Sequence, residues 1–401
     1  MSRRAPTVVV CVWAAALAVA LRADQDFEIE QVQVIFRHGD RAAGQIEVYK
    51  TDPYDDIYRR SGYGQLTEQG MRREYQLGLL LRRRYDELLG PATRYDSYFA
   101  RSTDYERTKM SLQLVLAGLN SRRRYDELYW TPVPVKYVER QLDFMRIVTQ
   151  CPRFRKLFDE LEASPDLRAK FRRYESFYAY LRNVTGLTTR RLFTPYVLYT
   201  NVHSALQMGL GLPDWCAAEH MEQLREIAAM LFDALVATEE MRRIAVGPTI
   251  DEILNNVYEQ ERGVNKARKM YLYSGHDINL ATFLRAHEFD RVPDDCSYGS
   301  AIIIEKLRGN DDERVYLRMM YYDGMTEELR SLKMPDCGYE CPLEDYRRLV
   351  EPLLPTAEVR YCYSLDIFCD LVRYPPPGEP RPSTEWLVMR EDIFSLKYPL
   401  S

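Results

Sequence analysis

Three times along this sequence, a short strand-like segment runs into charged residues and then into a helical pattern. Strands that alternate with helices form α/β sheets, and ligands bind such sheets outside the carboxyl ends of the strands, where junctions of this kind meet. The three junctions are FEIEQVQVIF at 27–36 before Arg37-His38-Gly39-Asp40-Arg41, DSYFA at 96–100 before Arg101, and MYLYS at 270–274 before His276-Asp277.

The remaining patterns divide the chain around a long helical segment. Apolar spacing predicts helices over 65–86 and 103–119, the second with Thr103 and Glu106 at capping-box spacing. Residues 142–260 are dominated by helical patterns, with breaks at Ser164-Pro165, at 209–213 and at Gly247-Pro248. Strand signals return at 270–274, 301–307 and 315–322. This order predicts an α/β sheet that is split by a helical segment.

The N-terminus has the features of a secretory signal peptide. Arg3 and Arg4 precede an apolar run from Val8 to Leu21 and a small residue at Ala23. The run is shorter than the roughly 20 apolar residues that span a bilayer, and no second long apolar segment follows it. We therefore expect an exported protein without a membrane anchor, either secreted or in the lysosomal lumen. In such a protein the sequon at Asn183 is a candidate glycosylation site.

These signals together give the expected domain organisation. It consists of a signal peptide at 1–23, an α/β catalytic core at 24–140 and 261–373, a mainly helical inserted domain at 141–260, and an irregular, proline-rich tail at 374–401.

Charge and cysteine content restrict the class of partner. The 55 Lys and Arg residues and the 60 Asp and Glu residues are interspersed and give a net charge of -5, so the chain lacks the basic patch of a nucleic-acid binder. Outside the signal peptide the cysteines of an exported chain are disulfide candidates before they are metal ligands. Their spacing alone leaves the connectivity open, and Cys337-x-x-x-Cys341 has no second pair beside it that would indicate zinc.

The charged residues at the three junctions suit a phosphate monoester. Arg37, Arg41 and Arg101 could hold the phosphoryl oxygens through bidentate hydrogen bonds. His38 stands between arginines whose charge lowers the pKa of its imidazole, so it can stay neutral and nucleophilic in acid. Asp277 is the candidate that protonates the leaving group and then takes a proton from water. Since this carboxyl must start protonated, the sequence predicts an acidic optimum.

Four segments of the chain resemble the histidine acid phosphatases, in particular the animal prostatic and lysosomal enzymes. They are VQVIFRHGDR (32–41), GYGQLTEQGMRREYQLGLLLRRRY (62–85), ARSTDYERTKMS (100–111) and YSGHDINL (273–280). The resemblance implies a phosphoglycerate mutase-like fold. This fold has a large α/β domain, whose mixed and mainly parallel central sheet is flanked by helices, and a smaller helical domain.

The resemblance also implies roles for individual residues. His38 would be the phosphorylated nucleophile and Asp277 the acid, with Arg37, Arg41, Arg101 and His276 on the phosphate. It implies no metal and no cofactor, a homodimer, and disulfides between Cys151 and Cys362, Cys216 and Cys296, and Cys337 and Cys341. Two positions depart from the family pattern: Ala43 replaces a common proline, and Ile278 replaces a common threonine beside Asp277.

These two departures keep a second class of function open. An exported ligand-binding or storage protein could retain the phosphatase scaffold with weak or no turnover. Within the enzymes, a phosphomutase or phytase of the same superfamily is a further alternative, although the signal peptide argues against a glycolytic mutase.

Overall fold

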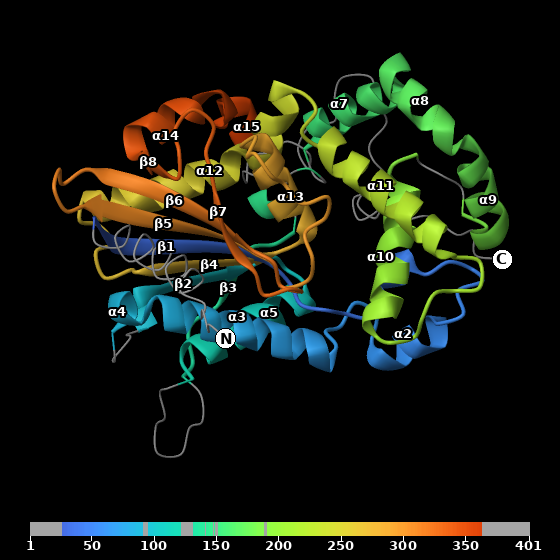
Figure 1. Cartoon of the computed structure of the whole chain (residues 1–401), viewed down its shortest axis with the longest axis horizontal. Helices are drawn as coiled ribbons and strands as arrows, with labels where there is room; N and C mark the ends of the chain where they lie inside the picture. The colour runs from blue at the N-terminus through green and yellow to red at the C-terminus, as the bar shows by residue number, and fades with distance from the viewer. Residues whose placement is uncertain are drawn as a thin grey trace, which may run out of the picture.

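A computed structural model describes residues 26–90, 95–121, 131–140, 142–146, 148, 151–187 and 191–362. The predicted signal peptide at 1–23 and the tail at 374–401 lie outside these residues. In Figure 1 a twisted sheet has helices on both faces, and a group of helices extends from one end of it.

The sheet has the strand order β3-β2-β4-β1-β5-β6-β7, with β8 paired to β6. The strands β3, β2, β4 and β1 are parallel to one another, and the sheet continues antiparallel from β1 through β5, β6 and β7. This confirms the predicted mixed sheet flanked by helices, and its parallel part carries all three junctions. The strands are β1 (Phe27–Arg37), β2 (Tyr98–Ser102), β3 (Lys136–Tyr137), β4 (Met270–Gly275), β5 (Ala301–Gly309), β6 (Val315–Tyr322), β7 (Leu329–Leu332) and β8 (Glu340–Pro342).

Alternation along β1 sends successive side chains to opposite faces of the sheet. Val34 and the residues two positions before and after it point into the core on one face of the sheet. The helices α3 (Glu68–Arg84) and α5 (Glu106–Leu119) cover this core. On the other face the amide of Gln33 donates to the carbonyl of Ile253 at 3.0 Å, so α12 lies directly on the sheet (Figure 1). A buried strand with polar glutamines is stable here because each amide has a partner.

The helices occupy three positions around the sheet (Figure 1). The lower face is covered by α3 (Glu68–Arg84), α4 (Asp86–Leu89) and α5 (Glu106–Leu119), and the upper face by α12 (Glu239–Glu261), α13 (Asp277–Ala286), α14 (Leu343–Leu349) and α15 (Ala357–Tyr361). The group at the end of the sheet contains α2 (Asp55–Ser61), α7 (Pro152–Ala163), α8 (Pro165–Phe171), α9 (Glu175–Thr185), α10 (Phe193–Gln207) and α11 (Ala218–Ala234).

The predicted break at Gly247-Pro248 is wrong, because α12 continues through Pro248. A β-carbon on Gly247 would lie 2.3 Å from the carbonyl oxygen of Leu353, so the helix is packed tightly against the segment after α14. This tertiary contact outweighs the helix-breaking preference of proline. The division into a catalytic core and an inserted domain at 141–260 stays a prediction.

Two of the three predicted disulfides are present. They join Cys151 to Cys362 and Cys337 to Cys341. The third, between Cys216 and Cys296, is not formed, since both thiols are free and buried. The sulfur of Cys216 lies 3.9 Å from the carbonyl oxygen of Ala217. Burial raises the pKa of each thiol to about 12, so both remain protonated.

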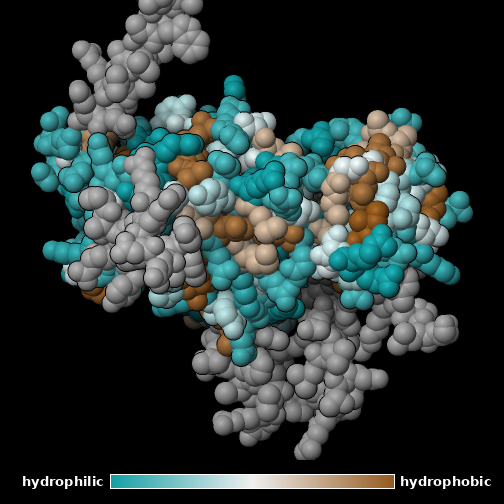
Figure 2. All heavy atoms as spheres, turned by 90° about the horizontal axis from the view of Figure 1, so that it is seen from below, coloured by the Kyte–Doolittle hydropathy of each residue, from teal (hydrophilic) through white to brown (hydrophobic). Residues whose placement is uncertain are grey.

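The surface features bear on the export prediction. The face shown in Figure 2 is mostly hydrophilic, with hydrophobic side chains in separate groups. Within the described residues, no helix combines the length and the apolar character needed to cross a membrane. Asn183 is exposed near the end of α9, and Thr185 of the same sequon is buried, with its hydroxyl donating to the carbonyl of Leu181 at 2.7 Å.

Candidate active site

The loop after β1 is held by its own backbone. The amide of His38 donates to the carbonyl of Gly275 at the end of β4, and the amide of Gly39 donates to the hydroxyl of Ser111. A β-carbon on Gly70, in the first turn of α3, would lie 2.1 Å from the carbonyl oxygen of Asp40. Glycine at position 70 therefore allows the loop to rest directly on the helix backbone, which fixes the position of His38.

The imidazole of His38 is oriented by a hydrogen bond to its own loop. Its Nδ1 lies 2.9 Å from the carbonyl oxygen of Gly39. Because a carbonyl can only accept, Nδ1 carries the proton and Nε2 keeps its lone pair. Burial first, and then the charges of Arg107 and Arg41, hold the pKa of His38 well below its usual value. The ring is therefore a neutral base with Nε2 available.

Arg37 and Arg41 lie beside His38, and each has an acidic partner. Nη2 of Arg37 is 3.0 Å from Oδ2 of Asp277, and its guanidinium lies 4.1 Å from the ring centroid of Tyr298. Arg41 forms two hydrogen bonds with the carboxylate of Glu47, at 2.7 and 2.6 Å. Glu47 belongs to the short helix η1 (Gln45–Glu47) and was not predicted to belong to the site. These contacts hold both guanidiniums rigidly.

Arg101, the third predicted phosphate ligand, has a carboxylate partner of its own. It forms a buried ion pair of 2.6 Å with Asp143, and its guanidinium lies 4.3 Å from the ring centroid of Phe144. Arg101 is also not among the charged residues that have the largest effects on the pKa of His38 or of His276.

Arg107 is a further arginine near the two histidines, which the sequence analysis did not assign to the site. The helix α5 begins at Glu106 and not at 103, so Arg107 lies in its first turn. Of all the charges, it has the largest effect in lowering the pKa values of His38 and His276. Burial and then Arg41 lower the pKa of Arg107 itself to about 10, and it has no ion pair with any described residue. Among the described residues, Arg107 is thus a cation at the site that has no carboxylate partner.

His276 and Asp277 stand where β4 passes into α13. Nε2 of His276 lies 2.9 Å from the hydroxyl of Thr103, and the ring centroids of His276 and His38 are 5.6 Å apart. Burial, followed by Arg107 and Arg146, holds the pKa of His276 well below its usual value. The structure therefore brings both predicted histidines together, each in the neutral form.

The carboxylate of Asp277 is held from three directions. Besides Arg37, it accepts a hydrogen bond of 2.8 Å from the amide of Ile278, and the hydroxyl of Tyr196 lies 3.2 Å from both of its oxygens. Tyr196 comes from α10, about 80 residues earlier in the chain. The sequence gave no signal for Tyr196, whereas Arg107 lay within the matched segment at 100–111.

Ala43 and Ile278, the two departures from the family pattern, supply no group that would react with a substrate. Ala43 is fully buried, and its carbonyl accepts the amide of Gly64, so backbone contacts hold the loop without proline. The side chain of Ile278 packs against the hydrophobic core. Asn279 does not replace the missing hydroxyl at Asp277: its Oδ1 accepts the amide of His276 at 2.9 Å, and its Nδ2 donates to the carbonyl of Met145.

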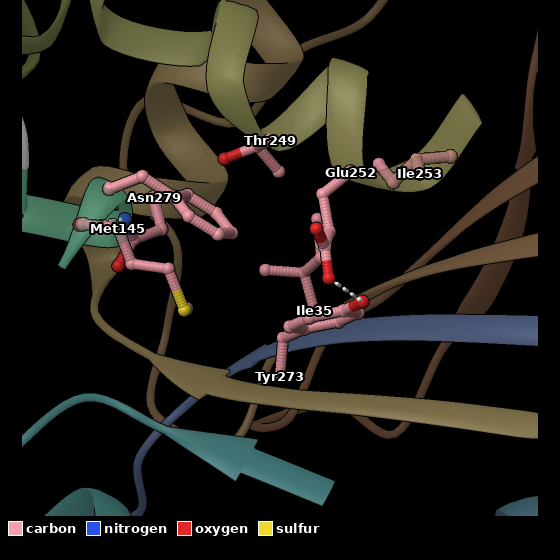
Figure 3. A pocket seen from close by; sticks show the side chains of 8 residues that line it. Ile35, Met145, Thr249, Glu252, Ile253, Tyr273 and Asn279 are labelled. Atoms are coloured by element: carbon pink, nitrogen blue, oxygen red, sulfur yellow. Dashed lines mark hydrogen bonds between the residues drawn. The ribbon is translucent and has the colours of Figure 1, made fainter. Parts of the chain in front are cut away.

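A small pocket lies beside this part of the site (Figure 3). In Figure 3, Asn279 and Met145 stand at one side and the hydrogen bond between Tyr273 and Glu252 at the other. Asn279 lines this pocket and also accepts a hydrogen bond from the backbone amide of His276. Neither His38 nor Asp277 lines the pocket. In the described part of the chain, no group of three or more His, Cys, Asp or Glu side chains could hold a metal ion.

Fold and site together define an α/β protein that can hold a phosphoryl group against a buried, neutral histidine. A family model of the histidine phosphatase superfamily, branch 2, matches residues 28–322. The chain belongs to this superfamily.

Curated relatives cover most of the chain. Venom acid phosphatase Acph-1 of Apis mellifera is 34% identical over 84% of this chain and 88% of its own length. Prostatic acid phosphatase of Rattus norvegicus is 31% identical over 84% of this chain and 91% of its own length. Lysosomal acid phosphatase of Homo sapiens is 30% identical, with 81% and 78% covered.

Solved structures show the same fold. The phytase of Citrobacter braakii superimposes with a TM-score of 0.63 at 18% identity, covering 83% of this chain and 99% of that one. Hafnia alvei phytase in complex with myo-inositol hexakis sulphate gives 0.64 at 16% identity, covering 83% and 98%.

Proposed function

We propose that this member of the histidine phosphatase superfamily hydrolyses phosphate monoesters in acid through a covalent phosphohistidine on His38. The observation that carries the proposal is the hydrogen bond from Nδ1 of His38 to the carbonyl of Gly39, which leaves Nε2 free beside three arginines. A neutral imidazole nucleophile at acidic pH is the condition that such chemistry requires.

The phosphate group would be held by Arg37, Arg41, Arg107 and His276. Arg107 replaces Arg101 in this assignment because Arg107 has no carboxylate partner among the described residues, whereas Arg101 is already paired with Asp143. The first turns of α5 and α13 contain Arg107 and Asp277, and the N-terminus of a helix favours a bound anion. We assign to Arg101 the structural role of holding Asp143.

The reaction would proceed in two displacements. In the first, Nε2 of His38 forms a bond to phosphorus while the ester P–O bond breaks, and the leaving oxygen takes the proton of Asp277. In the second, water attacks phosphorus, the N–P bond breaks, and Asp277 takes a proton from that water. The products are the alcohol and inorganic phosphate, and the enzyme returns to its starting protonation state.

The cellular setting is proposed from the sequence together with the relatives. Residues 1–23 would direct export, and the mature enzyme would act outside the cell or in the lysosomal lumen, in keeping with venom and lysosomal relatives. A glycan on the exposed Asn183, a homodimer, and a separate helical domain within 141–260 are further parts of this proposal.

Trapping the intermediate tests the mechanism directly. The protein with intact disulfides is mixed with ³²P-labelled phenyl phosphate at pH 5, in chelator, and quenched in alkali, where phosphohistidine is stable. We expect label on His38, turnover of p-nitrophenyl phosphate, and loss of both in His38→Ala. His220→Ala, outside the site, is the matched control. Turnover that persists in His38→Ala would refute the mechanism, and tight phosphate binding without turnover would favour the ligand-binding alternative.

A further inference from the structure

The ring of Tyr298 lies against both Arg37 and His38. Tyr298 stands three residues before β5, and its side chain is fully buried. The guanidinium carbon of Arg37 is 4.1 Å from the centroid of this ring, and the ring centroid of His38 is 5.7 Å from it. Burial has the largest effect on the pKa of Arg37, Arg41 and Arg107, and Tyr298 lies close enough to act on all three. Tyr298 is therefore a neighbour of every arginine that we assign to the phosphate.

Two side chains of α10 hold the ring of Tyr298. The imidazole of His203 stacks on it, with the ring centroids 5.3 Å apart and the planes inclined by 16°. The hydroxyl of Ser204 lies 3.2 Å from the hydroxyl of Tyr298. Because stacking fixes the plane of the ring and the hydrogen bond fixes its direction within that plane, the side chain of Tyr298 has a defined orientation.

The backbone around Tyr298 is joined to the catalytic loop. The amide of Gly299 donates to the carbonyl of His38 at 3.3 Å, and the amide of Arg37 donates to the carbonyl of Ser300 at 2.9 Å. A β-carbon on Gly324 would lie 2.2 Å from the carbonyl oxygen of Tyr298, so the segment after β6 packs directly on this backbone. These contacts fix the position of Tyr298 relative to Arg37.

The guanidinium of Arg37 is restrained at its edge and at its face. Nη1 donates to the carbonyl of Cys296 at 2.5 Å, and Nη2 pairs with Asp277 at 3.0 Å. The buried Nε has no hydrogen-bond partner among the described residues. The ring of Tyr298 covers the face. A planar guanidinium that is held in this way keeps the directions of its N–H groups fixed, and bidentate binding of a phosphoryl group requires this.

We propose that Tyr298 is a positioning residue for phosphate binding and transfer, whose ring keeps the plane of the Arg37 guanidinium aligned with the phosphoryl group at His38. The inference rests on the proposed function, since it takes Arg37 as a phosphate ligand. A guanidinium is attracted to the face of an aromatic ring, and the attraction is stronger where water is excluded, as at this buried ring. Loss of the ring lets the guanidinium tilt, whereas loss of the hydroxyl alone does not.

Variants of the full-length, disulfide-bonded protein that keep or remove the ring test this role. Tyr298→Phe keeps the ring and loses the bond to Ser204, and Tyr298→Leu removes the ring. Tyr346→Leu is the control, because it removes another fully buried tyrosine, bonded to His287 outside the site. The measurements are kcat/KM for p-nitrophenyl phosphate, affinity for inorganic phosphate by calorimetry, and urea unfolding.

The ring, and not the hydroxyl, should determine both phosphate affinity and turnover. We expect Tyr298→Leu to lower kcat/KM and phosphate affinity about tenfold or more, and Tyr298→Phe to stay within about threefold of the wild type. Tyr346→Leu should lower stability alone, so a general loss of packing does not account for the difference.

A second pair of variants decides the role if Tyr298→Leu does not fold. His203→Phe keeps the stack on Tyr298 and His203→Ala removes it, and His203 is only partly buried. We expect phosphate affinity to fall severalfold in His203→Ala and to be kept in His203→Phe.

The results for the two proposals are distinguishable. If the folded Tyr298→Leu or His203→Ala variant binds phosphate as the wild type does, or if Tyr298→Phe loses as much as Tyr298→Leu, the positioning role is overturned, while turnover in the wild type upholds the phosphatase. If the wild type binds phosphate without hydrolysing the ester, the proposed function fails and the same affinities decide the role of Tyr298. A folded wild type that does neither overturns both.

Discussion

Arg101 and Asp143 form an ion pair inside the protein, with Nη2 of the arginine 2.6 Å from Oδ1 of the carboxylate and both side chains buried. The pair ties the end of β2 to the segment before η3 (Phe144–Arg146), where the amide of Met145 also donates to Asp143. We therefore propose that Arg101, within β2, serves the structure and that Arg107, in the first turn of α5, acts on the histidines.

This arrangement predicts different losses for the two arginines. Arg107→Gln should lower kcat/KM for p-nitrophenyl phosphate by about a hundredfold or more while leaving stability nearly unchanged, because it removes a donor to the phosphoryl group. Arg101→Gln should instead lower the free energy of unfolding by about 3–5 kcal/mol, because it leaves Asp143 buried without its partner. Steady-state kinetics and urea unfolding of both variants measure this.

A double variant tests whether the stability loss in Arg101→Gln comes from the unpaired charge of Asp143. Arg101→Met combined with Asp143→Leu removes both charges and should recover much of the stability. If Arg101→Gln lost activity as strongly as Arg107→Gln while remaining fully stable, the assignment of the two arginines would have to be reversed.

Tyr196→Phe should impair the proton donor selectively. The hydroxyl of Tyr196 contacts both oxygens of Asp277, so its loss changes the orientation of that carboxyl. We expect about a tenfold fall in kcat for butyl phosphate, whose alkoxide needs a proton, and a smaller fall for p-nitrophenyl phosphate, whose leaving group does not. Tyr199→Phe, on the same helix but bonded to Asp295, is the control. Equal losses on both substrates would contradict the positioning role.

Buried histidines should make the fold less stable in acid. Burial lowers the pKa of His287 from 6.5 to about 4, and its ring stays neutral between Phe283 and Tyr346. The unfolded chain takes up this proton below pH 6.5 and the folded chain only near pH 4, so the stability from this group is complete above pH 6.5 and declines as the pH falls toward 4.

The expected loss from His287 is roughly 3 kcal/mol across that interval. In His287→Gln the side-chain amide can still bond to Phe283 and Tyr346, but it does not titrate. This variant should therefore lose the part of the pH dependence of stability that comes from His287. Urea unfolding at pH 7 and pH 4.5 provides the comparison, and an unchanged difference between the two pH values would exclude His287 as a source.

Gly70→Ala should disturb the catalytic loop through a single methyl group. The new carbon would lie 2.1 Å from the carbonyl oxygen of Asp40 and 2.6 Å from its amide nitrogen. Since backbone must move, we expect a loss of about 1–3 kcal/mol in stability and at least a tenfold loss in kcat. Gly44→Ala is the control, because its nearest neighbour is 3.5 Å away and its φ is −73°. Wild-type kinetics in Gly70→Ala would show that the loop tolerates displacement.

The sequence alone determined the fold class and most of the site. The strands that end beside His38, Arg101 and His276, and the helices after them, follow from local periodicity, and the sheet then brings the ends of these strands together. His38, Arg37, Arg41, His276 and Asp277 all lie at the predicted strand ends and lie close together.

Only the tertiary structure showed that Arg101 is paired with Asp143, that Arg107 acts on the histidines, and which helix contacts Asp277. The capping-box spacing of Thr103 and Glu106 suggested a helix start three residues too early, since the Thr103 hydroxyl bonds to Thr108 and His276 instead of capping α5. Tyr196 reaches Asp277 from α10, a contact between residues far apart in sequence. Local patterns fix where elements form, but the direction of each side chain depends on how those elements pack.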